Sequence, residues 1–351
     1  MARTFEAASM SEVQATTVDP AERMLERMTP VQRVHSILHR YPALSPAVVL
    51  ILAAVVLGSF NNRFFNPSNL SLVAQQVAVV GGLAVGQTLI ILTAGIDLSV
   101  GAIMVFTAIV MAGSAANFGV PGPLALAIGL LVGTLAGGLN GLLVTRLRLP
   151  PFIVTLGTLN IFTALTLLVS NGASIQGRNI PDILLWTGTP IGLGPFRITT
   201  GVLLMLAMYA IATYVLRNTA FGRHIYAVGD DREAARLAGI AVNRILLSAY
   251  LTAGFIFAVT AWILIGRVGA ASPNAASDAN LDSITAVVIG GTSLFGGRGI
   301  IIGSLLGALI VGVFRNGLAL AGVDVLYQTL VVGVLVIVAV ATDQWIRRVR
   351  A

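Results

Sequence analysis

The polar side chains that could do chemistry in this sequence lie within long apolar stretches, and most are amides and hydroxyls. Such groups donate and accept hydrogen bonds without carrying charge, which suits contact with a neutral polar solute. The candidates for lining a path through the protein are Gln76, Gln87, Asn140, Asn160, Thr292, Ser293 and Asn316, with Phe295 as a candidate apolar gate. Each could instead serve packing, the polar ones by joining helices and Phe295 as part of the core.

Two of these side chains have a spacing that links them. Gln76 and Gln87 are 11 residues apart, about three turns of an α-helix, so they share a helix face. Asp97 and Ser99 follow on the same stretch of chain. We expect this pair to cap the helix that begins just after it, with a gate at the inner mouth as the alternative.

The residue types that the chain lacks exclude several kinds of catalysis. There is no Cys, so thiol catalysis, zinc–thiolate sites and iron–sulfur clusters are excluded. There is no Lys, because all 21 basic residues are Arg, and a nucleotide-binding P-loop requires a Lys. No nucleophile–base pair or metal-ligand cluster stands out among the other residues, which argues against a membrane enzyme. If ATP is used, another chain must bind it.

The composition indicates that membrane helices position these groups. Hydrophobic residues make up 56% of the 351 residues and charged residues 10%, against about 25% charged in a soluble domain. Helices satisfy their own backbone hydrogen bonds in lipid, so we expect an all-α polytopic membrane protein. The net charge of +7 fits Arg-rich cytoplasmic loops, and we expect no nucleic-acid partner.

Ten apolar segments are candidates for crossing the membrane, which takes about 20 apolar residues. They are 44–60, 69–92, 98–116, 123–145, 152–170, 199–216, 245–266, 283–297, 299–320 and 325–342. The first is short, and the eighth is short and rich in Gly. An even number of spans places both termini on the same side of the membrane.

The positions of the Arg residues predict which side that is. With both termini in the cytoplasm, 16 Arg residues fall in cytoplasmic segments and 4 in outer loops, as the positive-inside rule requires. Arg315 falls within the ninth span. We expect its side chain to reach outward or to pair with Asp324, and lining a solute path beside Asn316 is the alternative.

The domain organisation is simple. Residues 1–43 form a polar cytoplasmic extension without a cleavable signal peptide, and the apolar spacing over 21–39 predicts an amphipathic helix on the lipid surface. Residues 44–345 form the transmembrane domain, with a long charged inner loop at 217–244, and residues 346–351 form a cytoplasmic tail.

Two Gly-rich stretches, 86–101 and 290–303, interrupt the helical pattern about 200 residues apart. Both combine small residues, a Thr and a charged residue in a segment flanked by Gly. Interrupted helices at corresponding positions of an internal repeat are typical of transporters. We therefore predict an internal repeat.

Four separated motifs carry a resemblance to a known family. They are ILTAGIDLSVGAI at 91–103, GRHIYAVGDDREAARLAGI at 222–240, ITAVVIGGTSLFGGRGIIIGSLLGALIVG at 284–312, and NGLALAGVDVLYQTLVVGVLVIVAVATD at 316–343. In this order they resemble bacterial ABC-importer permeases for ribose, xylose, fructose and similar sugars. The resemblance covers roughly residues 60–345.

This resemblance implies a fold, a function and a set of partners. It implies a permease with about ten helices in an arrangement like that of the vitamin-B12 importer, in the bacterial inner membrane. The permease is expected to pair with a second copy or a paralogue and with two cytoplasmic ABC ATPase subunits. A periplasmic sugar-binding protein is expected to deliver the substrate.

The inner loop contains the segment that the resemblance assigns to ATPase coupling. Asp230 or Asp231 can cap a short helix, because an acidic side chain is favourable at a helix N-terminus. The residues that match the family's coupling motif are Asp230, Asp231, Glu233, Ala234, Ala235, Arg236, Leu237 and Gly239. Small side chains here would give a smooth face for a groove on the ATPase. An ordinary charged loop is the alternative.

Four Arg residues of the outer loops, Arg63, Arg178, Arg197 and Arg267, are candidates for docking an acidic patch on the binding protein. Lipid headgroup contact or solvation is the alternative for each. A branched-chain amino-acid permease is a second hypothesis, but such a permease should lack the GIDLSVG and GTSLFGGRG motifs. A stand-alone secondary transporter is a third, although carboxylates for an ion relay are nearly absent from the spans.

Overall fold

The computed structural model describes residues 43–192, 194–275 and 278–348. The amphipathic helix predicted at 21–39 lies outside the described residues, as does nearly all of the predicted N-terminal extension. The described residues are largely helical, with four two-residue strands.

Seven helices of the described chain are long and apolar enough to cross a membrane. They are α4 (Pro67–Leu92), α5 (Val100–Phe118), α6 (Gly122–Arg146), α7 (Pro151–Ser170), α9 (Thr200–Asn218), α12 (Val242–Val268) and α14 (Ile301–Leu320). Shorter apolar helices are α3 (Leu44–Phe60), α13 (Ala279–Ile289) and the first half of α15 (Val325–Arg348). The fold is therefore that of a polytopic helical membrane protein, and the number of ten spans stays a prediction.

Local sequence explains where several of these helices begin and end. Pro67 and Pro151 open α4 and α7, where a missing backbone N–H costs no helical hydrogen bond. The Asn66 side chain accepts a hydrogen bond from the backbone N–H of Ser68 and caps α4. Gly119 ends α5 in the left-handed conformation that L-residues disfavour.

The eighth predicted span is wrong in its bounds. Only 283–289 of the predicted 283–297 is helical, because α13 ends at Ile289 and a Gly-rich turn follows. At 1.5 Å per residue, the 11 residues of α13 cover roughly half of a bilayer core of about 30 Å. α13 runs antiparallel along α14, where Gly307 lies against the Ala286 carbonyl. It is a half-helix supported by a full-length one.

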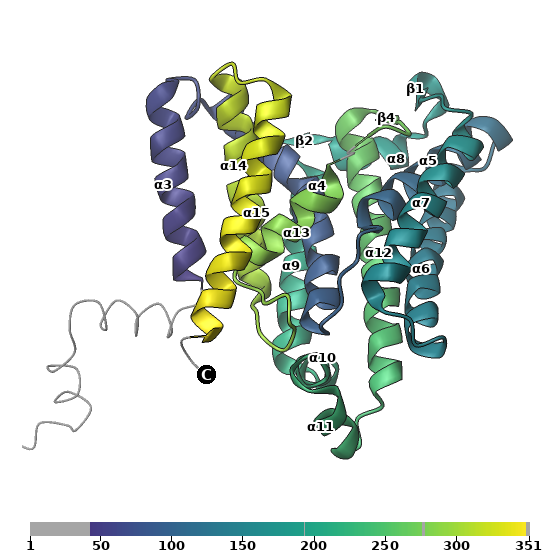
Figure 1. Cartoon of the computed structure of the whole chain (residues 1–351). Helices are drawn as coiled ribbons and strands as arrows, with labels where there is room; N and C mark the ends of the chain where they lie inside the picture. Colours follow the sequence, from purple (N-terminus) through teal and green to yellow (C-terminus); the bar gives the residue numbers. More distant parts are fainter. Residues whose placement is uncertain (1–42, 193, 276–277, 349–351) are drawn as a thin grey trace, which may run out of the picture.

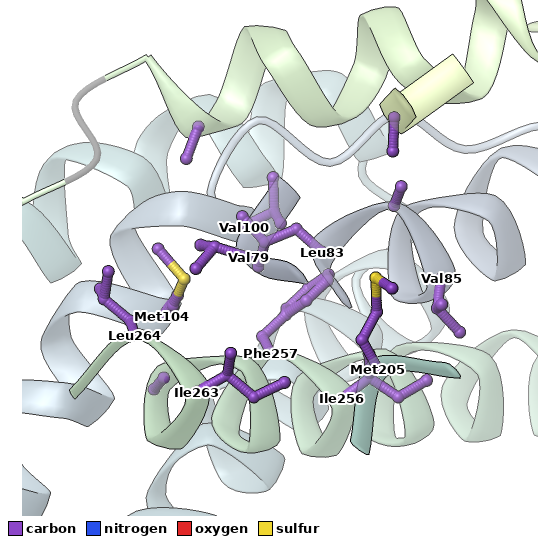
Figure 2. Close-up of a cluster of buried hydrophobic side chains, with 14 of the residues drawn as sticks. Val79, Leu83, Val85, Val100, Met104, Met205, Ile256, Phe257, Ile263 and Leu264 are labelled. Carbon is purple, nitrogen blue, oxygen red and sulfur yellow. The ribbon is translucent and has the colours of Figure 1, made fainter. Parts of the chain in front are cut away.

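The core lies between α4 and α12, with α5 and α9 packed against them. Figure 2 shows Phe257 of α12 among side chains from all four helices. Gly86 of α4 lies directly against the Phe257 ring, so the helices approach closely at that point. The labelled members of the cluster are Val79, Leu83, Val85, Val100, Met104, Met205, Ile256, Phe257, Ile263 and Leu264.

The two ends of the bundle are built differently, as Figure 1 shows. One end carries the short elements β1 (Ile175–Gln176), η1 (Gly177–Asn179), α8 (Asp182–Leu185), η2 (Trp186–Gly188), β2 (Pro190–Ile191), β3 (Ile198–Thr199) and β4 (Ala270–Ala271). β1 pairs antiparallel with β4, and β2 with β3. The other end carries α10 (Ala220–Asp230) and α11 (Arg232–Leu237). The predicted loop 217–244 thus contains two helices.

Candidate translocation site and coupling region

A cavity of about 750 Å³ lies between α4, α12, α13, α14 and α15. We name it the α13 cavity, because the N-terminal turn of α13 forms part of its wall. Its polar lining residues are Asn69, Gln76, Arg267, Ser272, Asn274, Asp278, Asp282, Arg315, Asn316 and Gln328. Of the predicted path residues, the cavity brings together Gln76 and Asn316.

An ion-pair network forms one side of the α13 cavity. The guanidinium of Arg315 donates to Asp282 at 2.8 Å and to Asp278 at 3.3 Å. The Asp282 side chain is only 6% exposed, so its charge depends on Arg315 for compensation. The expected pairing of Arg315 with Asp324 is wrong, because the partners of Arg315 are Asp278 and Asp282. Antiparallel packing of α13 on α14 places the two carboxylates opposite Arg315 instead.

A pair of amides forms another part of the wall. Asn69 of α4 and Asn316 of α14 exchange two hydrogen bonds, at 2.8 and 2.9 Å, so each amide is donor and acceptor. Asn69 also donates to the Phe64 carbonyl at 2.9 Å. The pair ties α4 to α14 directly beside Arg315. It leaves one N–H of Asn316 and further oxygen lone pairs that a solute in the cavity could use.

The other predicted path residues lie elsewhere. Gln87 is fully buried in α4, and neither its amide nitrogen nor its oxygen has a hydrogen-bond partner among the described residues. Asn140 of α6 donates to Ser99 at 2.8 Å. Asn160 lies on the exposed side of α7 and donates to Leu156 of its own helix. The structure does not bring these three amides together.

The expected cap by Asp97 and Ser99 is only partly correct. Ser99 occupies the N-cap position of α5, but its side chain makes no capping hydrogen bond. Both its backbone N–H and its hydroxyl donate to Asp97 Oδ1, at 2.7 and 2.6 Å. Asn140 completes this buried cluster by bonding Ser99 and, at 3.5 Å, Asp97. Asp97 therefore fixes the turn that leads into α5.

Thr292, Ser293 and Phe295 lie in the turn between α13 and α14 and do not line the α13 cavity. Thr292 and Ser293 are buried, and Phe295 is 55% exposed. This turn meets the C-terminal end of α4: the N–H of Gly297 donates to the Leu92 carbonyl at 3.0 Å. The two Gly-rich stretches of the sequence therefore contact each other.

The last turn of α10 also lies against Leu92 and Gly297. A Cβ on Gly229 would lie 1.7 Å from the Leu92 carbonyl oxygen and 2.6 Å from the Gly297 nitrogen. The backbones thus touch with no room for a side chain. We name the contact of Gly229, Leu92 and Gly297 the glycine lock.

Side chains of α10 and α11 reinforce the glycine lock. The Tyr226 hydroxyl donates to the Gly299 carbonyl at 2.9 Å. Burial raises the pKa of Tyr226 and Arg217 opposes the shift, so the phenol stays protonated and able to donate. Arg232 donates to the Thr93 carbonyl at 3.2 Å. Both bonds connect the cytoplasm-facing helices of the predicted topology to the irregular ends of α4 and α13.

The short helix expected in the inner loop is present as α11. Of the two expected capping residues, Asp231 performs the role: its Oδ1 accepts from the N–H groups of Glu233 and Ala234, at 2.8 and 3.0 Å. Asp230 is the last residue of α10. Ala235 is buried against Val228 and Leu246, so it anchors α11 and does not belong to its outer face.

The outer face of α11 is open to a partner. Leu237 is 83% exposed on this face. The exposed members of the predicted coupling set are Asp230, Asp231, Glu233, Ala234, Arg236, Leu237 and Gly239.

The Arg residues predicted to dock a binding protein fall into two groups. Arg63 and Arg197 are exposed at the end of the bundle opposite α10. Arg267 is half-buried and lines the α13 cavity, so its surroundings differ from those of the other two. The Arg178 side chain lies outside the described part of the chain.

The family described as "Branched-chain amino acid transport system / permease component" matches residues 69–340. The chain belongs to this family. The match confirms the resemblance that the four motifs carry, and it spans the α13 cavity, the glycine lock and α11. No solved structure matches the chain.

Curated relatives cover nearly the whole chain. It is 49% identical to the fructose import permease protein of Rhizobium meliloti, over 92% of this chain and 91% of that protein. It is 39% identical to the ribose import permease protein of Bacillus subtilis, over 86% and 92%. It is 34% identical to the D-allose transport system permease protein of Escherichia coli, over 86% and 91%.

Sequence reasoning missed several polar residues of the α13 cavity, among them Asn69, Asp278 and Asp282. Asp278 and Asp282 are four residues apart, a spacing that places both on one helix face. Asn69 precedes Gln76 by seven residues, two turns of the same helix. Both spacings were visible in the sequence. What was not visible is that Arg315 lies opposite the two carboxylates.

Proposed function

We propose that this chain is the membrane-spanning permease subunit of an ATP-driven sugar importer that carries a monosaccharide into the cytoplasm. The observation that carries the proposal is its 49% identity to a fructose import permease over 92% of the chain. Relatives named for ribose and allose point to the same class of solute. A branched-chain amino-acid permease is the second candidate, because the family description names those solutes.

The proposal includes a topology and partners. It has ten spans, with both termini in the cytoplasm, an internal repeat and a fold like the vitamin-B12 importer, in the bacterial inner membrane. The partners are two ABC ATPases, a second permease copy or paralogue, and a periplasmic sugar-binding protein docked by Arg63, Arg178 and Arg197. The opposite locations of α11 and the α13 cavity support this arrangement.

The proposed mechanism couples α11 to the interior of the permease. Nucleotide binding would draw the ATPases together and move α11 through its exposed face, which includes Leu237, Glu233 and Arg236. The glycine lock joins α10 to the ends of α4 and α13 by backbone contacts, so a shift of α10 must shift them as well. Opening of the lock would give the solute a way to the cytoplasm.

Gln87 provides a polar group along this proposed route of the solute to the cytoplasm. It lies on the same helix as Gln76 and about 16 Å closer to the glycine lock. Its amide is fully buried without a hydrogen-bond partner in the described structure, and such a group is costly unless something satisfies it. We propose that the solute does so in passage.

Reconstitution tests the function. The chain would be placed in proteoliposomes with its cognate ATPase and binding protein, and uptake of labelled fructose, ribose, allose and leucine measured. We expect ATP-dependent uptake of at least one monosaccharide and none of leucine. Uptake of leucine alone would favour the second candidate. Uptake of a sugar without the ATPase would indicate a stand-alone transporter and overturn the proposal.

A paired variant tests the coupling role. We expect Glu233→Ala with Arg236→Ala to abolish uptake while the permease still binds its ATPase, because both side chains lie on the exposed face of α11. Arg146→Ala, an exposed Arg at the end of α6 on the same side of the bundle, is the matched control. Equal uptake by the paired variant and the control would remove α11 from the mechanism.

A further inference from the structure

The α13 cavity concentrates charge in a chain whose described membrane-spanning helices otherwise carry charged residues only near their ends. Arg315 lies within α14, which is apolar enough to span a membrane, and Asp282 lies in the half-helix beside it. Charged side chains within a span are costly and rare, and they often mark a solute pathway. Two Asn residues would have tied α13 to α14 at lower cost.

We propose that the α13 cavity is a transient binding site for the monosaccharide, where Arg315, Asp282 and the Asn69–Asn316 pair hold its hydroxyl groups. This inference rests on the proposed function. It adds to it a site on the permease itself, separate from the binding protein that delivers the sugar.

The charges of the cavity favour a neutral ligand. Its lining contains two Arg residues, Arg267 and Arg315, and two carboxylates, Asp278 and Asp282, so the formal charges cancel. At Arg315 and Asp282, an anion or a cation would have to break the existing ion pair to bind. A sugar hydroxyl can donate to a carboxylate and accept from a guanidinium while Arg315 and Asp282 stay paired.

The size and the chemistry of the walls fit the same ligand. About 750 Å³ lies within the roughly 300–1,000 Å³ typical of small-ligand sites. The wall combines polar groups with apolar ones such as Val79, Val311 and Leu264. Hydroxyl groups can meet the polar side of the cavity while the carbon faces of a sugar ring lie against the apolar side.

The position of the site connects it to the glycine lock. The first turn of α13 contributes Asp282 to the cavity, and the turn that follows α13 contributes Gly297 to the lock. α13 is only 11 residues long, and Gly297 follows its last residue, Ile289, by eight positions, so one short helix and the Gly-rich turn join the cavity to the lock. A sugar that binds at one end can therefore bias the contact at the other.

The absence of Cys from the chain makes a direct test simple. Ser272→Cys would place one thiol in the cavity wall, and Asn117→Cys would place one on the exposed end of α5, outside the cavity. Each variant would be assembled with the ATPase in nanodiscs, without the binding protein. The rate of labelling by a water-soluble maleimide would be measured with and without fructose, ribose or allose.

We expect at least one of these sugars to slow labelling of the Ser272→Cys variant, by about threefold when the sugar is present at twice its Kd. Labelling of the Asn117→Cys variant should not change. If the complex transports a sugar that gives no protection at any concentration up to molar, the binding site is refuted and the proposed function stands. If no sugar is transported, the proposed function itself fails.

A second variant identifies the groups that hold the sugar. Adding Asp282→Asn to Ser272→Cys keeps the side-chain shape but removes the charge, and should raise the sugar concentration for half-protection about tenfold. Labelling of the same variant without sugar reports whether the cavity is intact. Unchanged protection, with labelling at the ordinary rate, would exclude Asp282 from the binding groups.

Discussion

The α13 cavity and the glycine lock are joined by the same helices but are built on opposite principles. The cavity is bounded by long polar side chains that leave about 750 Å³ between them. The lock contains no side chain at its centre: Gly229, Leu92 and Gly297 meet backbone to backbone. The chain is therefore open to a solute at one end of α4 and closed at the other.

Because they are built differently, the α13 cavity and the glycine lock respond differently to a binding partner. Side chains that bond across a cavity can exchange one partner for another at modest cost, because water or a solute replaces each lost hydrogen bond. Backbones in direct contact cannot adjust gradually, since close packing leaves no space to absorb a small shift. The cavity suits recognition of a solute, and the lock suits a two-state closure driven from α10 and α11.

The largest effect is expected from breaking the lock. Gly229→Ala puts a methyl carbon 1.7 Å from the Leu92 carbonyl oxygen, where real Cβ atoms come no closer than 3.0 Å. Both neighbours are backbone, so the segments must separate, and we expect a loss of at least about 3 kcal/mol in unfolding free energy. ATP-driven uptake of sugar should be abolished. Thermal unfolding in detergent and uptake in proteoliposomes measure the two effects.

Gly157→Ala is the matched control, because it makes the same change in a helix with nothing within 4 Å of the new methyl group. It should be neutral or stabilising by up to about 1 kcal/mol, since Ala favours helix over Gly. If Gly229→Ala behaved like Gly157→Ala, the three backbones would not be in contact and the closed end would need another explanation.

The next largest loss of unfolding free energy is expected when the ion pair of the α13 cavity is broken. Arg315→Leu leaves the buried Asp282 without its partner and should cost about 3 kcal/mol of unfolding free energy. Replacing both residues, in Arg315→Leu with Asp282→Leu, should recover most of that loss, because no buried charge remains. Uptake should stay low in both variants. A double variant that transports as well as the parent chain would show that the pair serves stability alone.

Hydropathy predicted where the helices lie but not where α13 ends. Each of the ten predicted segments contains a helix, because a run of about 20 apolar residues is readable without tertiary contacts. Residues 290–297, GGTSLFGG, contain no charged residue, and hydropathy does not distinguish a turn of this kind from the continuation of a helix. The lock that holds this turn depends on Leu92 and Gly229, which are far away in sequence.

The same limit explains which site residues could be predicted. The cap of α11 by Asp231 was predictable because it involves neighbours two and three residues away. The partners of Arg315 lie 33 and 37 residues away, and depend on the depth at which α13 begins. The sequence motifs identified the family, since they need no knowledge of contacts, and the family match bears them out.

A smaller effect on stability is expected when the amide pair of Asn69 and Asn316 is removed. A double-mutant cycle with Asn69→Ala and Asn316→Ala should give a coupling energy of about 1 kcal/mol, because each single change removes the same two hydrogen bonds. Asn69→Ala should cost more than Asn316→Ala, since it also removes the bond to the Phe64 carbonyl. Strict additivity in thermal unfolding would mean that the two amides do not contact each other.

The smallest loss of stability is expected from removing the cap of α11. This change also best distinguishes the roles of the two ends of the bundle. Asp231→Ala removes the cap of α11 and should cost about 1 kcal/mol. Asp324→Ala removes an equivalent hydrogen bond, to the Leu326 N–H at 2.8 Å, at the start of α15 and the opposite end of the bundle. Similar stability losses are expected, but only Asp231→Ala should lower ATP-driven uptake, because a frayed α11 transmits less motion to α10 and the lock. Equal uptake by the two variants would show that the order of α11 does not matter for coupling, and that the lock is moved by some other part of the chain.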